Sequence, residues 1–253
     1  NNNASASSAN AFGLGNTASN LNAVAFGYFN TSSGLNAVAV GSGNTASGQD
    51  SSASGNYNNV SDRNSSASGF SNTATATNTS AFGFTNTASA TSSSAFGFLN
   101  KASGIQSTAF GNTSTSTGLQ SSAVGYRNLA IGTLSSAFGA SSTASGDYSS
   151  AIGYRNDAST ARSVAVGYIN TASGSYSVAQ GISNTATGQA ATASGYYNTA
   201  SSYNASAFGN FNRASGLNSG SNAFGYLNVA SAKFSSAFGK SNTASATNTS
   251  AFG

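Results

Sequence analysis

The chain has 253 residues, of which only 5% are charged, compared with about a quarter in a typical soluble domain. Its formal net charge is +4, but the eight basic residues are scattered, which excludes a basic patch for nucleic acid. The chain contains no His, Cys or Glu, and its four aspartates are isolated, so no catalytic triad, carboxylate pair or metal site can be drawn. We therefore expect no enzymatic activity, no cofactor and no small-molecule substrate. No apolar run is long enough to span a membrane.

A repeat of seven residues organises the chain. Counting from Gly13, a small residue, usually glycine, recurs at every seventh position up to Gly216, and the same step resumes from Gly225 to Gly253. Residues 217–225 form a single unit of nine residues. With the glycine numbered as the seventh place, alanine holds the fifth place in nearly every unit. Because the units alternate between two types, the true repeat has 14 residues and occurs in 18 copies.

The two types of unit predict two short strands per repeat. The first type, with letters NTAS at residues 86–89, carries Asn third, and the second, SSAFG at residues 93–97, carries an apolar residue sixth. Recurrent glycine disfavours helix by about 1 kcal/mol each time, and no second apolar place exists for a coiled-coil seam. We therefore expect one all-β domain over residues 1–253, a parallel β-solenoid of 14-residue coils. The two extra residues within 217–225 should bulge at a turn.

Alternation of side chains predicts which residues lie inside the solenoid. In a strand the third, fifth and seventh places share one face, which here carries Asn or Ser, then Ala, then Gly. Small side chains let two sheets approach closely, so we place this face inside. Stacked Asn side chains would satisfy one another's amide groups. The expected ladder consists of Asn16, Asn30, Asn44, Asn58, Asn72, Asn86, Asn100, Asn128, Asn156, Asn170, Asn184, Asn198, Asn212, Asn228 and Asn242.

The sixth place is apolar in one strand of most coils, failing only at Ser54, Ser68, Gln180 and Ser194, and carries Ser or Thr in nearly every unit of the other type. Facing outward, the apolar residues would form a stripe larger than a soluble monomer tolerates, and the same stripe on other copies of the chain is the simplest cover. An alternative that stays open places Phe inside the solenoid and Ala outside. The expected oligomer interface comprises Phe12, Phe26, Val40, Phe82, Phe96, Phe110, Val124, Phe138, Ile152, Val166, Phe208, Phe224, Phe238 and Phe252.

Two further surface arrays are candidates for binding. An aromatic residue often follows the strand with the apolar stripe, where it would either pack along the rim of the oligomer or contact a ligand. The possible ligand surface comprises Tyr28, Phe84, Phe98, Tyr126, Tyr154, Tyr168, Tyr196 and Tyr226. The second array is an outward row of Thr in the other strand, similar to ice-binding faces. Since Lys101, Leu129, Asp157 and Arg213 interrupt the row, we expect a solvated face and keep ice binding as a minor alternative.

The repeat units resemble a known family over essentially the whole chain. SVAVG at 163–167, SSAIG at 149–153, NTASG at 170–174 and STASG at 142–146 are similar to the repeats of YadA-like heads of trimeric autotransporter adhesins. The resemblance implies a left-handed β-roll, three chains per head, and display on the bacterial outer membrane. It also implies binding to host matrix proteins, cells or other surfaces.

We therefore expect an extracellular, non-enzymatic adhesin head or structural rod. The chain shows no neck, coiled-coil stalk or membrane-anchor sequence, which leaves two possibilities open. It is either a fragment of an adhesin, or the subunit of an extracellular filament or phage fibre that uses the same repeat without a specific ligand. A stalk and anchor elsewhere in the gene would favour the adhesin.

Overall fold

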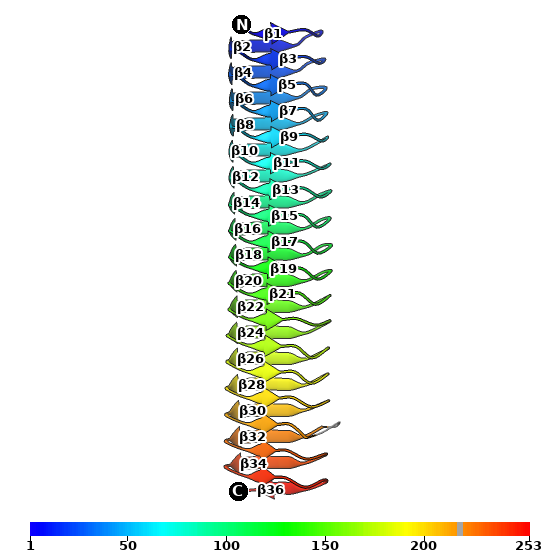
Figure 1. The fold of residues 1–253 in the computed structure, drawn as a ribbon, viewed down its shortest axis with the longest axis vertical. Helices are drawn as coiled ribbons and strands as arrows, with labels where there is room; N and C mark the ends of the chain where they lie inside the picture. The colour runs from blue at the N-terminus through cyan, green and yellow to red at the C-terminus, as the bar shows by residue number, and fades with distance from the viewer. Residues whose placement is uncertain (217–219) are drawn as a thin grey trace. The chain divides into compact units, whose positions relative to one another are not determined.

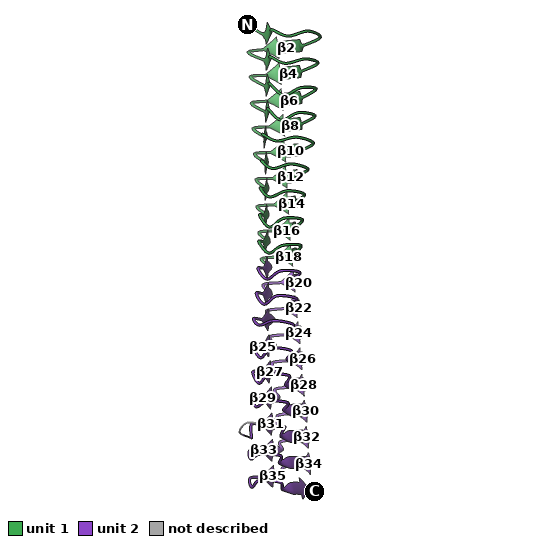
Figure 2. Ribbon diagram, turned by 90° about the vertical axis from the view of Figure 1, so that its right-hand side faces the viewer, with its two compact units in different colours: residues 1–127 green, residues 128–253 purple. Residues whose placement is uncertain are grey.

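The structure is a computed structural model that describes residues 1–216 and 220–253. Within these residues every regular element is a β-strand and no helix occurs. The chain divides into two compact units, Asn1–Arg127 (unit 1) and Asn128–Gly253 (unit 2), coloured green and purple in Figure 2. The single domain over residues 1–253 that the repeat predicts stays a prediction.

Each unit contains alternating short and long strands. The short strands of unit 1 are β1 (Asn3–Ala4), β3 (Thr17–Ala18), β5 (Thr31–Ser32), β7 (Thr45–Ala46), β9 (Asn59–Val60), β11 (Thr73–Ala74), β13 (Thr87–Ala88), β15 (Lys101–Ala102) and β17 (Thr115–Ser116). Its long strands are β2 (Asn10–Leu14), β4 (Val24–Tyr28), β6 (Val38–Ser42), β8 (Ser52–Asn56), β10 (Ser66–Phe70), β12 (Ser80–Phe84), β14 (Ser94–Phe98), β16 (Thr108–Asn112) and β18 (Ser122–Tyr126).

Unit 2 repeats this order. Its short strands are β19 (Leu129–Ala130), β21 (Thr143–Ala144), β23 (Asp157–Ala158), β25 (Thr171–Ala172), β27 (Thr185–Ala186), β29 (Thr199–Ala200), β31 (Arg213–Ala214), β33 (Val229–Ala230) and β35 (Thr243–Ala244). Its long strands are β20 (Ser136–Ala140), β22 (Ser150–Tyr154), β24 (Val164–Tyr168), β26 (Val178–Ile182), β28 (Thr192–Tyr196), β30 (Ser206–Asn210), β32 (Asn222–Tyr226), β34 (Ser236–Lys240) and β36 (Ser250–Phe252).

One short and one long strand make a coil, and each strand pairs in parallel with its equivalent in the next coil. Between β12 and β14, for example, Ala81 lies beside Ala95 and Phe82 beside Phe96, a step of 14 residues. Within each unit the long, even-numbered strands lie on one side and the short, odd-numbered strands on the other (Figure 1). The predicted parallel β-solenoid with two strands per 14-residue coil is confirmed. The left-handed winding stays a prediction.

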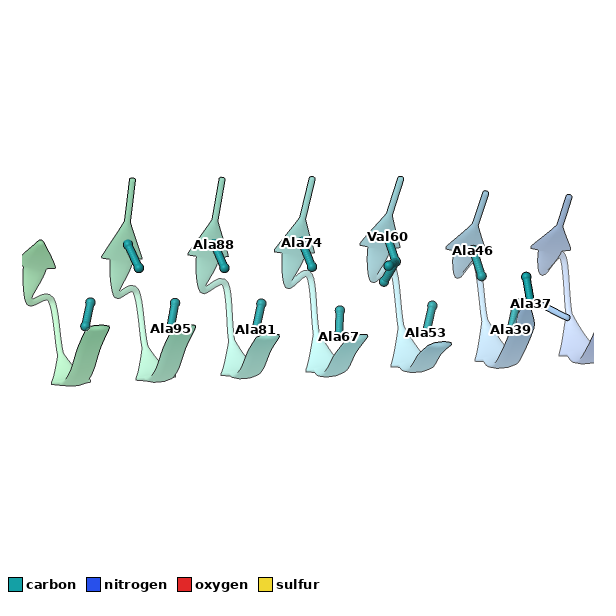
Figure 3. Packing of buried hydrophobic residues seen from close by; sticks show 12 residues of the cluster. Ala37, Ala39, Ala46, Ala53, Val60, Ala67, Ala74, Ala81, Ala88 and Ala95 are labelled. Carbon is teal, nitrogen blue, oxygen red and sulfur yellow. The ribbon is translucent and has the colours of Figure 1, made fainter. Parts of the chain in front are cut away.

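Alanine at the fifth place forms the core. Ala81 and Ala95 of the long strands point toward Ala74 and Ala88 of the short strands, and all four are fully buried (Figure 3). The largest of the fully buried side chains is Val60, which takes the same place in β9. Because a methyl group is small, the two sheets lie close together, and the Ala-lined interior confirms the predicted inward face.

The Asn residues of the predicted ladder stack beside this core. Asn30 donates from Nδ2 to Asn16 Oδ1 at 3.0 Å, to the Phe26 carbonyl at 3.0 Å and to the Gly41 carbonyl at 2.7 Å. Its own Oδ1 accepts the backbone N–H and Nδ2 of Asn44. The Phe26 contact closes the turn after the long strand, and the others join three coils. Each Asn therefore connects its own turn by hydrogen bonds to the coils before and after it. These side chains are almost all fully buried.

The glycines divide into two groups that the sevenfold count did not separate. In the short-strand units the seventh-place glycine, such as Gly104, is buried. In the long-strand units it is not: Gly97 is exposed, and its φ is +117°. A Cβ at Gly97 would lie 2.1 Å from the Gly111 carbonyl oxygen of the next coil. A Cβ at Gly104 would also meet the next coil, 2.0 Å from the Gly118 oxygen, so exposure and φ, not this contact, separate the two groups. The prediction that every seventh place faces inward is wrong for the long strands, where the glycine is not buried.

The turns place many non-glycine residues in the left-handed region. Phe29, Leu99 and Ile169, each at the second place of a unit, have φ of 50°, 55° and 56°. This conformation is unfavourable for such side chains. Each backbone N–H donates to a carbonyl of the preceding coil, as Leu99 does to Phe84 at 2.9 Å. The stack of coils therefore holds a conformation that an isolated turn would avoid.

The long repeat unit leaves the stacking intact on both sides. Asn228 donates from its backbone N–H to Asn212 Oδ1 at 3.0 Å, although 16 residues separate them. In the long strands Phe208 pairs with Phe224. The predicted bulge itself falls on residues 217–219, which lie outside the described residues.

Candidate functional site

The outward face of the long strands carries two neighbouring columns of large side chains. Phe96 at the sixth place and Phe98 at the strand end both belong to β14 (SAFGF) and are both accessible to solvent, with Gly97 at a φ of +117° between them. The sequence suggested that Phe98 and its equivalents follow the strand. Instead they are its last residues, so the predicted interface and the predicted ligand surface belong to the same sheet.

The sixth-place residues all lie outside the solenoid. Phe12, Phe26 and Phe110 are 59%, 54% and 54% exposed, while their neighbours at the fifth place are buried or nearly so. Phe138, Ile152 and Phe252 are also exposed. The remaining members of the predicted interface are half-buried, mostly by one another: Val40, Phe82, Phe96, Val124, Val166, Phe208, Phe224 and Phe238. The alternative with Phe inside and Ala outside is therefore wrong.

Ring stacking orders this sixth-place column. Phe82 and Phe96 stack with centroids 5.3 Å apart and an interplanar angle of 4°. In unit 2 Phe208, Phe224 and Phe238 continue in the same way at 5.1 Å. Two other pairs, Phe12 with Phe26 and Phe96 with Phe110, are tilted, with centroids 6.4 Å apart. The stacked rings form preformed apolar segments of the column that lose little side-chain entropy when covered.

Polar residues interrupt this column at the same place in each unit. In unit 1 the fourth and fifth long strands carry Ser54 and Ser68, and in unit 2 they carry Gln180 and Ser194. In both units a valine precedes the interruption and a phenylalanine follows it. The apolar face of each unit is therefore divided by one polar gap of two coils.

The strand-end column is aromatic and exposed. Its predicted members Tyr28, Phe84, Phe98, Tyr126, Tyr154, Tyr168, Tyr196 and Tyr226 are between 38% and 51% exposed. Phe84 and Phe98 stack at 5.1 Å with an angle of 12°, so their ring faces cover each other and mainly their edges are free. Arg155 lies over Tyr154 at 5.3 Å.

The Thr row lies on the outward side of the short strands. It is interrupted often, so only brief runs of consecutive coils carry Thr. Within a unit the longest uninterrupted runs are three coils, Thr17 to Thr45 and Thr171 to Thr199. Asp157 lies between Thr143 and Thr171 in the sheet. The row is thus broken by Asn59 and Lys101 in unit 1 and by charged and apolar residues in unit 2, and ice binding stays a hypothesis that no contact favours.

Asp157 gives a testable pH dependence. Its carboxyl group is half-buried, and this burial raises its pKa above the ordinary value of 3.8. A raised pKa means that the folded chain holds the proton more tightly, so the contribution of Asp157 to stability is greatest below pH 3.8 and is lost as pH rises through its folded pKa. Asp157→Thr, the residue of the neighbouring coils, should therefore raise stability at pH 7, by less than about 1 kcal/mol because solvent screens the group.

Urea unfolding at pH 7 and pH 3 checks this expectation. The stability difference between variant and wild type should shrink at pH 3, where the carboxyl group is protonated in both states. An equal difference at the two pH values would contradict it.

The described residues contain no pocket and no cluster of His, Cys, Asp or Glu side chains able to hold a metal ion. Among the same residues, no helix has the length and apolar character needed to cross a membrane. The candidate site is thus an extended surface.

The fold and this surface define a class: parallel β-solenoids built from 14-residue coils, with an Ala and Asn interior and an apolar face on one sheet. The family model described as YadA head domain repeat (2 copies) matches the chain at residues 18–44, 32–58, 46–72, 74–99, 102–128, 130–156, 144–168, 158–181, 172–198, 186–212, 200–219 and 230–253. The chain belongs to this family of YadA head domain repeats, as its resemblance predicted. No curated protein matches it.

Proposed function

We propose that this chain is a non-enzymatic adhesin head that associates with copies of itself, as a homotrimer, through the outward face of its long strands. The exposed sixth-place column carries this proposal, because it is apolar over most coils of each unit. Membership of the YadA head family supports the trimer and display on the bacterial surface.

The size of the apolar face supports self-association. Each Phe ring that a partner covers removes on the order of 100 Å² of apolar surface from water and contributes roughly 2 to 3 kcal/mol. A soluble monomer seldom exposes a patch of more than a few hundred Å². The column repeats with the period of the coils, so a second copy with the same period offers a matching surface along its whole length.

The strand-end aromatic column lies on the same sheet, and we assign it to the rim of this interface. The proposal includes binding of the head to a host matrix protein, a cell or another surface. Membership of the YadA head family is the only support for this binding. A filament or phage-fibre subunit is the alternative, and no contact in either unit favours it.

Removing rings from the face tests the proposal. We expect the triple variant Phe82→Ser, Phe96→Ser and Phe110→Ser to fold as a β-solenoid but to dissociate at a protein concentration at least tenfold higher than the wild type. Serine stands at this place naturally in Ser54 and Ser68, so the coil itself tolerates it. The measurement is molar mass by light scattering over a dilution series, with circular dichroism to verify the fold.

The matched control changes the opposite sheet. Ser89→Ala with Ser103→Ala alters the outward side of the short-strand sheet and should leave the molar mass unchanged. A wild-type chain that is monomeric and soluble at micromolar concentration would refute the proposed interface.

A further inference from the structure

Gln180 is a single amide within apolar surroundings. In β26 it lies between Val178 and Ile182 on the outward side of the strand, and in the preceding coil it pairs with Val166. Its side chain is exposed and makes no hydrogen bond within the described part of the chain. The following coil places Ser194 beside it. The backbone carbonyl of Gln180 accepts from Asn184 Nδ2 at 2.8 Å, but its side-chain amide makes no hydrogen bond in its own coil and is free to bond outside it.

A repeating apolar column contains little information about how two copies should align. If one copy slides along another by one coil, about 4.8 Å, most Phe and Val residues still meet apolar residues. A buried amide changes this balance, since an amide without a hydrogen-bond partner is unfavourable in an apolar interface. Single polar residues in the apolar seams of coiled coils select the register for this reason.

The two registers differ in what Gln180 meets. When copies associate in register, Gln180 of each copy faces its equivalents, and an amide has both donors and an acceptor with which to bond them. After a shift of one coil, it faces Val166 in one direction and only the shorter Ser194 in the other. Only the aligned arrangement pairs every amide.

We propose that Gln180 sets the register in which copies of this chain associate, through hydrogen bonds between equivalent Gln180 side chains. This inference rests on the self-association proposed above. The gap in unit 1 differs, because β8 also carries Ser52 and Asn56 on its outward side. All three outward residues of β8 are therefore polar, which suits a hydrated contact. Gln180 is the residue to which we assign the setting of the register.

Valine is the natural replacement for the test. Val124 and Val166 occupy the same sixth place in other coils, so Gln180→Val preserves the coil and extends the apolar column. Gln180→Asn is the matched control, since it keeps an amide at this place. The chain has no cysteine, so cysteines introduced one per chain report on the register without interference.

The experiment mixes two tagged forms of the full chain, Ser194→Cys and Phe208→Cys, refolds them together and oxidises them. Disulfides form only between Cα atoms about 4.4 to 6.8 Å apart. In aligned copies the disulfide joins position 194 of one copy to position 194 of another. In copies shifted by one coil it joins position 194 of one copy to position 208 of the other. With Gln180 present we expect the first product to exceed the second at least tenfold. Gln180→Val should lower this ratio at least fivefold, and Gln180→Asn should change it less than twofold.

Each outcome bears on a distinct claim. If Gln180→Val leaves the ratio of the two disulfides unchanged, Gln180 does not set the register. If the chain associates but forms neither disulfide, the proposal also fails, because Ser194 then lies away from the contact. Light scattering on the same samples decides the other claim: a monomeric mass would refute self-association itself.

Discussion

Asn86→Ala is expected to lower the free energy of unfolding by about 3 to 5 kcal/mol. Its Nδ2 donates to Asn72 Oδ1, to the Phe82 carbonyl and to the Gly97 carbonyl, at 2.9, 2.9 and 2.7 Å. The buried backbone N–H of Asn100 donates to Asn86 Oδ1 at 3.0 Å and would lose this acceptor. Alanine therefore opens a turn and leaves a buried donor without a partner. Urea unfolding followed by circular dichroism measures the change.

Chemically graded variants separate hydrogen bonding from size. Asn86→Asp should destabilise the chain at least as much as alanine, because a buried carboxylate would face the carbonyl oxygens that Nδ2 now contacts. Asn86→Ser should cost less, since Ser142 fills this place naturally, with Oγ 3.3 Å from the Gly153 carbonyl. The control is Asn210→Ala: Asn210 is exposed at a strand end, and the change should be within about 0.5 kcal/mol. Equal effects of Asn86→Ala and Asn210→Ala would refute the role of the ladder.

Gly97→Ala should be more damaging than Gly104→Ala, although both glycines hold the seventh place of a unit. Gly97 has a φ of +117°, and a Cβ there would meet the Gly111 oxygen at 2.1 Å. We expect a loss of at least about 3 kcal/mol from strain and overlap together. A Cβ at Gly104 would also meet a backbone atom, the Gly118 oxygen at 2.0 Å, but Gly104 has no positive φ. Ala90 stands at its place one coil earlier, so a shift of the neighbouring coil can accommodate a methyl group there. Its substitution should therefore cost less than that of Gly97, because it adds no strain from a positive φ.

Thermal and urea unfolding of the two alanine variants makes the comparison directly. If Gly104→Ala proved as destabilising as Gly97→Ala, positive φ would not be the reason why every long-strand unit carries glycine at this place.

The amino-acid sequence alone determined the coil. Spacing of seven, alternation of two unit types and small residues at the fifth place predicted parallel strands with Ala and Asn inside, and Ala81 and Asn86 are buried as expected. This succeeds because each coil contacts only its equivalents, so one repeat contains the rules for all of them. The sequence also held a signal that we did not use: every long-strand unit ends in glycine, whereas Ala76, Ala90 and Thr160 occur in the short-strand units.

Tertiary structure alone decided the positions that depend on contacts between coils. Positive φ at Gly97, strand ends that include Phe98, and left-handed turns at residues such as Leu99 follow from hydrogen bonds to the neighbouring coil, which composition and spacing do not reveal. Ring stacking such as that of Phe82 on Phe96 likewise appears only once the coils are superposed. The period specifies which residues are neighbours, and the packing of the neighbours then determines the backbone conformation and the surface they present.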